Sequence, residues 1–193
     1  MILIGYSGHA FVVYGILHAG SKIVNGYCDV IEKDYNPFGL SYFGTENSEA
    51  ALNAIKQNGY FIAVGDNLLR KKIHENLKAK NFTTDNAIHP SAVIDASATL
   101  ANEAVMIAAN VTINPLAAIG TGAICNTGCI IEHECIVGEF AHIGPGAVLC
   151  GNVKIGNGTF VGANAVIKQG ITAGAVVIKD VPDAVTVIGV PAK

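Results

Sequence analysis

Apolar residues recur every six positions through the C-terminal half of the chain. Eleven consecutive positions of this period carry no polar residue: Ile107, Ile113, Ile119, Cys125, Ile131, Val137, Ile143, Leu149, Ile155, Val161 and Ile167. Four residues after each of them stands a second residue that is mostly small, such as Ala117, Ala123 or Ala141. A helix would repeat near 3.6 residues and a simple strand near 2. The period of six therefore predicts short strands joined by tight corners, with the large apolar side chain pointing inward.

This repeat resembles that of the hexapeptide-repeat family, whose fold is a left-handed parallel β-helix with three hexads in each triangular coil. In such a solenoid each coil buries the apolar side chains of its neighbours. The period also continues upstream, one residue out of phase, through Ile88, Ile94 and Leu100. The change of phase predicts a one-residue insertion between Ala101 and Met106.

The first 85 residues show a different pattern, in which short apolar runs alternate with glycine turns and helical segments. Residues 2–4 indicate a buried strand that runs into the turn Gly5–His9 and then a helix over 10–19. Further strands are expected at 23–28 and 60–64, and a helix at 68–78 with Asp66 or Asn67 as its cap. This alternation predicts a Rossmann-like α/β domain with a parallel sheet over residues 1–85, followed by the β-helix over 86–193.

The first glycine turn is a candidate phosphate site. Gly8 and His9 stand where the first helix begins, and a helix N-terminus offers free N–H groups to an anion. The pattern is only G-x-x-G, so a plain tight turn explains it equally well. Asp29 follows the second strand, where an acidic residue meets a ribose hydroxyl in dinucleotide-binding units. A solvated carboxylate at a strand end is the alternative.

Two histidines in the repeat fall outside the inward positions. His133 and Glu134 are expected on an outward corner, and His142 is expected to face out as well. Coils of eighteen residues place Gly151 directly over His133, where a glycine leaves room for a ligand and exposes a backbone N–H. His142 lies half a coil from His133, so a homotrimer is expected to bring the two together across a shared cleft. A pair of solvated surface histidines is the alternative.

Composition and charge narrow the choice of partners. Hydrophobic residues make up 51% of the 193 residues, which excludes disorder, and 12 basic against 15 acidic residues with a single arginine, Arg70, argue against nucleic acid. The uncharged stretch 105–131 is longer than a bilayer span, but Asn, Thr and Pro interrupt it, so no membrane span is expected. The N-terminus lacks a basic region and a cleavage site, so we expect no signal peptide and a cytoplasmic protein.

A closer resemblance rests on longer segments. The segment NTGCIIEHECIVGEFAHIGPGAVLCGNVKIG, with GYSGHA, YFIAVGDNLLRKKI and the terminal GVPAK, resembles the PglD-type nucleotide-sugar N-acetyltransferases. The resemblance covers nearly the whole chain. It implies acetyl transfer from acetyl-CoA, without a metal, to the 4-amino group of a UDP-4-amino-4,6-dideoxy sugar, on the way to bacillosamine glycans.

The resemblance also implies roles for individual residues. The catalytic base falls on His133 with Glu134 beside it, the acetyl-CoA contact on His142, and the N–H near the thioester on Gly151. Asn126 matches a residue near the sugar amine. The positions that match the nucleotide-sugar crevice are Gly8, His9, Asp29 and Arg70.

Two departures from the family pattern concern the ligands. Relatives often show paired acidic residues where this chain has Asp29-Val30, which bears on the choice of nucleotide. After Ile167 the chain is also shorter than the family pattern by more than one hexad. This difference affects the end of the repeat at which the cofactor is expected to bind.

Other functions remain open at this point. A sugar O-acetyltransferase, such as one acting on sialic acid, would use the same fold and a hydroxyl acceptor. A zinc carbonic anhydrase of the β-helix type would need three converging imidazoles, and the hexads offer only His89, His133 and His142. A noncatalytic protein that binds a nucleotide sugar would lack thioester turnover.

Overall fold

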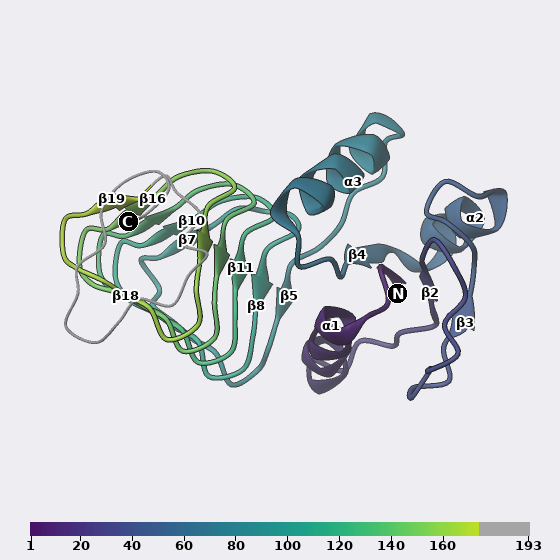
Figure 1. Cartoon of the computed structure of the whole chain (residues 1–193), viewed down its shortest axis with the longest axis horizontal. Coiled ribbons are helices and arrows are strands. Elements are labelled where there is room, and N and C mark those ends of the chain that lie inside the picture. The colour runs from purple at the N-terminus through teal and green to yellow at the C-terminus, as the bar shows by residue number, and fades with distance from the viewer. Residues whose placement is uncertain (174–193) are drawn as a thin grey trace.

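The computed structural model describes residues 1–173, which form an N-terminal α/β unit and a parallel β-solenoid (Figure 1). This confirms the predicted fold class, a Rossmann-like unit followed by hexapeptide coils. The shortened cofactor end beyond residue 173 and the terminal GVPAK lie outside the described residues. The last helix of the α/β unit ends at Ala79 and the first solenoid strand begins at Ala87. The division into functional domains at residue 85 stays a prediction.

Four parallel strands form the N-terminal sheet in the order β3-β2-β1-β4. The strands are β1 (Ile2–Ile4), β2 (Gly26–Cys28), β3 (Ser41–Tyr42) and β4 (Tyr60–Ile62). The helices are α1 (Gly8–Ala19), α2 (Glu49–Asn58) and α3 (Asn67–Ala79). Because side chains alternate along a strand, Ile2 and Ile4 pack in the cluster that holds α2 and α3, whereas Leu3 packs in the cluster that holds α1.

Two features of this sheet differ from the sequence prediction. The second strand begins at Gly26 rather than at residue 23, and Ile23 is exposed. Residues 41–58 contribute a strand and a helix that the sequence analysis did not predict. The start of α2 has a local signal, because Ser48 caps the helix by accepting a hydrogen bond from the Ala51 N–H.

The solenoid consists of fifteen two-residue strands in three parallel five-stranded sheets. The first face holds β5 (Ala87–Ile88), β8 (Met106–Ile107), β11 (Ile124–Cys125), β14 (His142–Ile143) and β17 (Phe160–Val161). The second face holds β6 (Val93–Ile94), β9 (Thr112–Ile113), β12 (Ile130–Ile131), β15 (Val148–Leu149) and β18 (Val166–Ile167). The third face holds β7 (Thr99–Leu100), β10 (Ala118–Ile119), β13 (Ile136–Val137), β16 (Lys154–Ile155) and β19 (Thr172–Ala173).

The strand register confirms the predicted coil length and the insertion. Cys125 pairs with Ile143, eighteen residues further on, so each coil contains three hexads. Ile88 pairs with Ile107, nineteen residues further on, which places one extra residue in the first coil. The second residue of each strand is the inward one, and those from Ile107 to Val161 are buried.

From residue 104 onward, one residue in every six has a left-handed backbone. These residues recur every six positions and are Ala104, Asn110, Leu116, Gly122, Gly128, Glu134, Phe140, Gly146, Asn152, Gly158, Asn164 and Gly170. Glycine and asparagine adopt this conformation readily, whereas other residues pay roughly 1 kcal/mol or more. Ala104, Leu116, Glu134 and Phe140 are therefore strained exceptions in an otherwise regular corner.

The α/β unit packs on the first face of the solenoid, which is turned toward α1 and α3 in Figure 1. Met106 and Ile124 point outward from this face, yet both are buried. They belong to one continuous apolar cluster with Val13 and Leu17 of α1. One face of the solenoid is thus covered by the chain's own N-terminal unit, whereas the second and third faces are not.

Candidate active site

His133 lies on the corner between the second and third faces, directly after β12. Its side chain is 52% exposed, and its Nδ1 lies 3.1 Å from Oε2 of Glu134, which is 57% exposed. A carboxylate accepts hydrogen bonds only, so the imidazole donates from Nδ1, and in the neutral ring Nε2 then carries the free lone pair. The pair is therefore oriented as a proton acceptor that is open to solvent.

Gly151 stacks on His133 in the next coil, as the eighteen-residue period predicted. A Cβ added at Gly151 would lie 2.5 Å from both Cε1 and Nε2 of His133, so only glycine accommodates the ring here. The His133 carbonyl accepts a hydrogen bond from the Asn152 N–H at 2.8 Å, which holds the two coils together. Within residues 1–173 the Gly151 N–H donates to no acceptor. A basic nitrogen and a free backbone donor thus lie side by side on one corner.

Glu134 has a left-handed backbone, with φ 61°. Most equivalent corners of the other coils use glycine or asparagine, so the glutamate is retained at a conformational cost. Leu116, one coil earlier on the same corner, is also strained and is exposed. Two of the four strained residues of the solenoid thus lie on the His133 corner, and the other two, Ala104 and Phe140, lie on the corner between the third and first faces.

His142 points outward from the first face, the direction expected from the repeat. The α/β unit of the same chain covers that face and leaves the residue only 7% exposed, so it is not a free surface side chain. Its Nε2 lies 3.1 Å from Nδ2 of buried Asn126, and its ring centroid lies 5.9 Å from that of His9. The structure therefore brings His9, Asn126 and His142 together, away from His133.

Electrostatics keep the two buried histidines neutral. Burial lowers the pKa of His142 to about 4; the Arg70 charge and His9 lower it further, whereas a backbone hydrogen bond to Gly65 opposes them. Burial, followed by the Arg70 charge, also lowers the pKa of His9 to about 4. Both rings are therefore uncharged near neutral pH and act as hydrogen-bonding groups rather than as cations.

Arg70 was expected in the nucleotide-sugar crevice, and the structure revises this placement. Its side chain is only 3% exposed. Nε donates to the Gly122 carbonyl, and the two terminal nitrogens donate to acceptors that include the Phe140 and Gly65 carbonyls. All five guanidinium N–H groups have acceptors inside the chain, so none remains for a ligand.

The crevice itself lies at the carboxyl end of β1. A cavity of about 470 Å³ is lined by Tyr6, Ser7, Gly8, Phe11, Ile31, Glu32, Lys33, Asp34 and Tyr35. Ser7 makes no side-chain cap and the first turn of α1 has no acidic residue, so the first N–H groups of α1 are open to an anion. The cavity lies at the carboxyl ends of β1 and β2, and the carboxyl ends of the strands are where open α/β sheets bind ligands.

Asp29 stands beside this crevice and is already engaged. Its carboxylate accepts hydrogen bonds from the N–H groups of Tyr6, at 2.9 Å, and Val30, at 2.7 Å. It also forms an ion pair with Lys33 at 3.1 Å. Sequence reasoning missed Phe11, Lys33 and Tyr35, although the spacing of Lys33 four residues after Asp29 is a signal that could have identified it.

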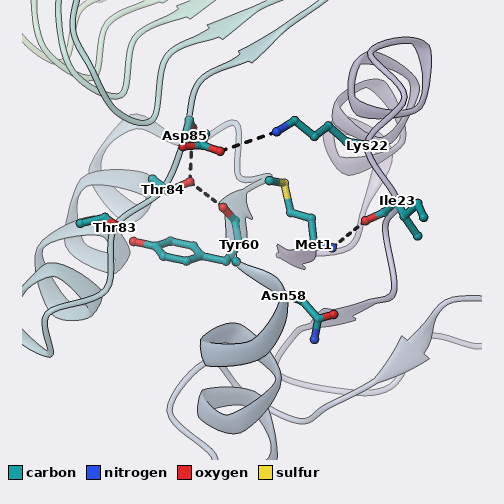
Figure 2. A pocket seen from close by; sticks show the side chains of 9 residues that line it. Met1, Lys22, Ile23, Asn58, Tyr60, Thr83, Thr84 and Asp85 are labelled. Atoms are coloured by element: carbon teal, nitrogen blue, oxygen red, sulfur yellow. Dashed lines mark hydrogen bonds and ion pairs between the residues drawn. The ribbon is translucent and has the colours of Figure 1, made fainter.

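A second cavity, of about 280 Å³, lies at the opposite, amino end of the strands (Figure 2). Here the Thr84 hydroxyl donates to the Tyr60 carbonyl at 2.5 Å, and Lys22 pairs with Asp85 at 3.7 Å. These contacts attach the segment between the two units to the N-terminal sheet. Ligands of α/β sheets bind at the carboxyl ends of the strands, so this cavity is not the candidate site.

Within residues 1–173 no helix combines the length and the apolar composition of a membrane span. No group of three His, Cys, Asp or Glu side chains in that range of the chain is placed to hold a metal ion.

Comparison with family models matches both parts of the chain. Residues 1–77 match the PglD N-terminal domain. Residues 134–169 match the bacterial transferase hexapeptide, six repeats. The two matches fall on the α/β unit and on the solenoid, and together they include the crevice and the stack of coils that follows His133.

Solved structures and curated proteins agree with these matches. PerB from Caulobacter crescentus, in complex with CoA and GDP-perosamine, is 38% identical with a TM-score of 0.81 over 100% of this chain and 95% of its own. The acetyltransferase domain of PglB from Neisseria gonorrhoeae, in complex with acetyl coenzyme A, is 31% identical with a TM-score of 0.81 over 100% and 97%. GDP-perosamine N-acetyltransferase of Escherichia coli O157:H7 is 30% identical over 148 residues, which are 69% of this chain and 66% of that protein. The chain belongs to the PglD-type nucleotide-sugar N-acetyltransferases, which are hexapeptide-repeat acyltransferases with acetyl-CoA as cosubstrate.

Proposed function

We propose that this protein transfers the acetyl group of acetyl-CoA to the 4-amino group of a nucleotide-activated 4-amino-4,6-dideoxy sugar. The observation that carries the proposal is the His133 corner, where Nε2 of the imidazole lies against Gly151 and its free N–H. The complexes of PerB with CoA and GDP-perosamine support the donor and the class of acceptor.

The residues of the corner account for each step of direct transfer. Nε2 of His133 takes a proton from the sugar amine, whose nitrogen then forms a bond to the thioester carbonyl carbon. The Gly151 N–H donates to the oxyanion of the tetrahedral intermediate. The carbon–sulfur bond breaks as the carbonyl reforms, CoA leaves as a thiol after taking up a proton, and the amide is the product. No covalent acyl-enzyme is required.

In this mechanism Glu134 orients the imidazole of His133. By accepting from Nδ1 it keeps the imidazole in the tautomer whose Nε2 is free, and it stabilises the imidazolium that forms.

Replacement of Glu134 by asparagine should raise the melting temperature of the protein and lower its kcat. Asn adopts the left-handed conformation more readily, so the melting temperature should rise by about 2–4 °C if about 1 kcal/mol of strain is relieved. The rate constant kcat should fall at least about tenfold, because the carboxylate that orients the imidazole is lost. Calorimetry and an assay of CoA release measure the two effects.

Asn110→Gly is a matched control, because it changes another left-handed corner far from His133 and should alter kcat little. An unchanged kcat in Glu134→Asn would contradict the role given to Glu134.

The proposed active site requires more than one chain. The α/β unit covers the first face, whereas His133 lies on the corner between the other two faces, so one chain cannot bring its own crevice to its own His133. A homotrimer in which the crevice of one chain faces the corner of another satisfies this geometry. Exposed Leu116 on the corner and exposed Ile136 on the third face are suited to such an interface.

The remaining residues have roles that rest on the family resemblance. Asn126 is proposed to lie near the sugar amine and His142 to contact acetyl-CoA, and their hydrogen bond would orient both side chains. Gly8 and His9 at the N-terminus of α1 are proposed to meet the diphosphate, and Asp29 the ribose. The nucleotide is proposed to be uridine diphosphate; guanosine diphosphate, which is part of the GDP-perosamine named for PerB and for the Escherichia coli relative, is the rival.

The proposal is tested by an acceptor screen with acetyl-CoA. CoA release is measured with UDP-, GDP- and dTDP-linked 4-amino-4,6-dideoxy sugars, and each is matched by the same nucleotide sugar with a 4-hydroxyl group. Turnover of amines alone is expected. Faster turnover of the hydroxyl compounds would make the protein an O-acetyltransferase, and binding of nucleotide sugar without CoA release would reduce it to a noncatalytic binder.

A further inference from the structure

Helix α3 presents a stripe of polar side chains to the solenoid. Asn67, Arg70, His74 and Lys78 are spaced by three or four residues, so they share one face of the helix. Asn67, Arg70 and His74 are buried, which is unusual for side chains of these types. None of them belongs to the His133 corner, so the proposed chemistry leaves their burial unexplained.

The stripe contacts one corner of four successive coils. Asn67 Nδ2 donates to the Gly158 carbonyl at 2.9 Å. Arg70 Nε donates to Gly122 at 2.9 Å, and Arg70 Nη2 donates to Phe140 at 2.9 Å. At the other end of the helix, Glu103 forms an ion pair with Lys78 and lies 3.7 Å from His74 Nε2.

The dimensions of the two elements agree. Neighbouring strands lie about 4.8 Å apart, so the three steps from the coil of residue 103 to that of residue 158 span about 14 Å. The eleven residue steps of α-helix from Asn67 to Lys78 span about 16 Å at about 1.5 Å per step. The stripe can therefore follow all four coils without bending of the helix.

Arg70 is the central contact of this stripe. The same guanidinium also donates to the carbonyls of Val64 and Gly65, which lead from β4 into α3. No described carboxylate forms an ion pair with it, and burial lowers its pKa to about 10. An apolar side chain would avoid this desolvation, whereas the guanidinium fork supplies hydrogen bonds of defined direction.

We propose that α3 is a brace across four coils and that Arg70 is a positioning residue, which sets the orientation of the nucleotide-sugar crevice on the solenoid. This inference rests on the proposed function. The sugar amine must reach His133 of a neighbouring chain, so a rotation of the α/β unit displaces the amine even when the nucleotide stays bound. Figure 2 shows Thr84 and Asp85, which attach the segment between the units at the other end of the sheet. The α/β unit could still rotate about this attachment, and the contacts of α3 limit that rotation.

The test compares Arg70→Met with Arg70→Lys and with Lys71→Met, an exposed neighbour on the same helix. A displacement of about 1 Å can cost about a hundredfold in rate, so Arg70→Met should lower kcat for the nucleotide sugar about ten- to a hundredfold. The KM for the nucleotide sugar and the Kd for acetyl-CoA should change less than threefold, because both sites keep their own residues. Acetylation of the free 4-amino sugar, which does not use the crevice, should keep its rate.

Arg70→Lys should behave like Arg70→Met, because an ammonium group cannot reproduce the fork, and Lys71→Met should behave like the wild type. A wild-type kcat in either Arg70 variant would overturn the proposal. An equal loss for the free sugar and the nucleotide sugar would overturn it too, because Arg70 would then serve the fold in general.

Two further measurements separate this proposal from the proposed function. In calorimetry the wild type should unfold in one transition and Arg70→Met in two, whether or not any nucleotide sugar is acetylated. A single transition in Arg70→Met would overturn the brace, whereas wild-type inactivity with every acceptor would overturn only the proposed function. If Arg70→Met does not fold, Asn67→Ala removes the contact to one coil, and an unchanged kcat in that variant would overturn the proposal.

Discussion

His133→Ala is expected to lower kcat for the transfer of acetyl to the nucleotide amino sugar by roughly 10²–10⁴-fold. This is the usual contribution of a positioned general base. A sugar amine is largely protonated near neutral pH, and an exposed imidazole with Nδ1 held by Glu134 is the group placed to accept its proton. The KM values for both substrates should change little, since the ring is assigned to proton transfer. Steady-state measurement of CoA release determines kcat and KM separately.

The control for this variant is His18→Ala, which removes an exposed imidazole on α1 and should leave kcat unchanged. The activity that remains in His133→Ala should increase with pH, because a growing share of the amine needs no base. A kcat within threefold of the wild type would remove His133 from the mechanism and leave the proposed chemistry without a base.

Gly151→Ala is expected to keep the fold and to lose about a hundredfold in kcat. The new Cβ would lie 2.5 Å from Cε1 and Nε2 of His133, so the ring must move. The backbone at Gly151 is not left-handed, and the exposed His133 side chain can rotate into solvent. The melting temperature should therefore change by no more than about 2 °C, which corresponds to about 0.5 kcal/mol. Nε2 of His133, the proposed base, would by contrast leave its place beside the Gly151 N–H.

Gly15→Ala makes the same chemical change in α1, where a Cβ meets no atom within 4 Å, and it should not lower kcat. A wild-type kcat in Gly151→Ala would show that the ring need not lie over residue 151. A large loss of stability would show instead that the stack of coils, rather than the position of the ring, had been disturbed.

The position of His133 over the glycine was accessible from the sequence for a simple reason. In a solenoid each coil contacts only the next one, so spatial neighbours lie at a constant separation along the chain. Once the period of six and the coil of eighteen are known, addition places Gly151 over His133 and the insertion before Met106. The same arithmetic would have identified the left-handed corners and the exceptional glutamate at 134.

Contacts between the two units have no such constant separation. Arg70 meets Gly122 and Phe140 because α3 happens to lie along one corner, and nothing in the local pattern around Arg70 indicates this. His142 has the sequence pattern of an exposed outward residue, and only the docking of the α/β unit buries it. The crevice likewise gathers Phe11 and Lys33 from a helix and a loop that meet after the chain has folded.

The sequence by itself determined the repeating architecture, the coil length and the residue types that meet at the His133 corner, because these depend on periodicity and on residue type. Only the tertiary structure decided which face of the solenoid is covered, which histidines are desolvated, and that the single arginine donates hydrogen bonds to both units. These properties arise from packing between segments distant in sequence, and desolvation at that contact, rather than local pattern, sets the state of each side chain.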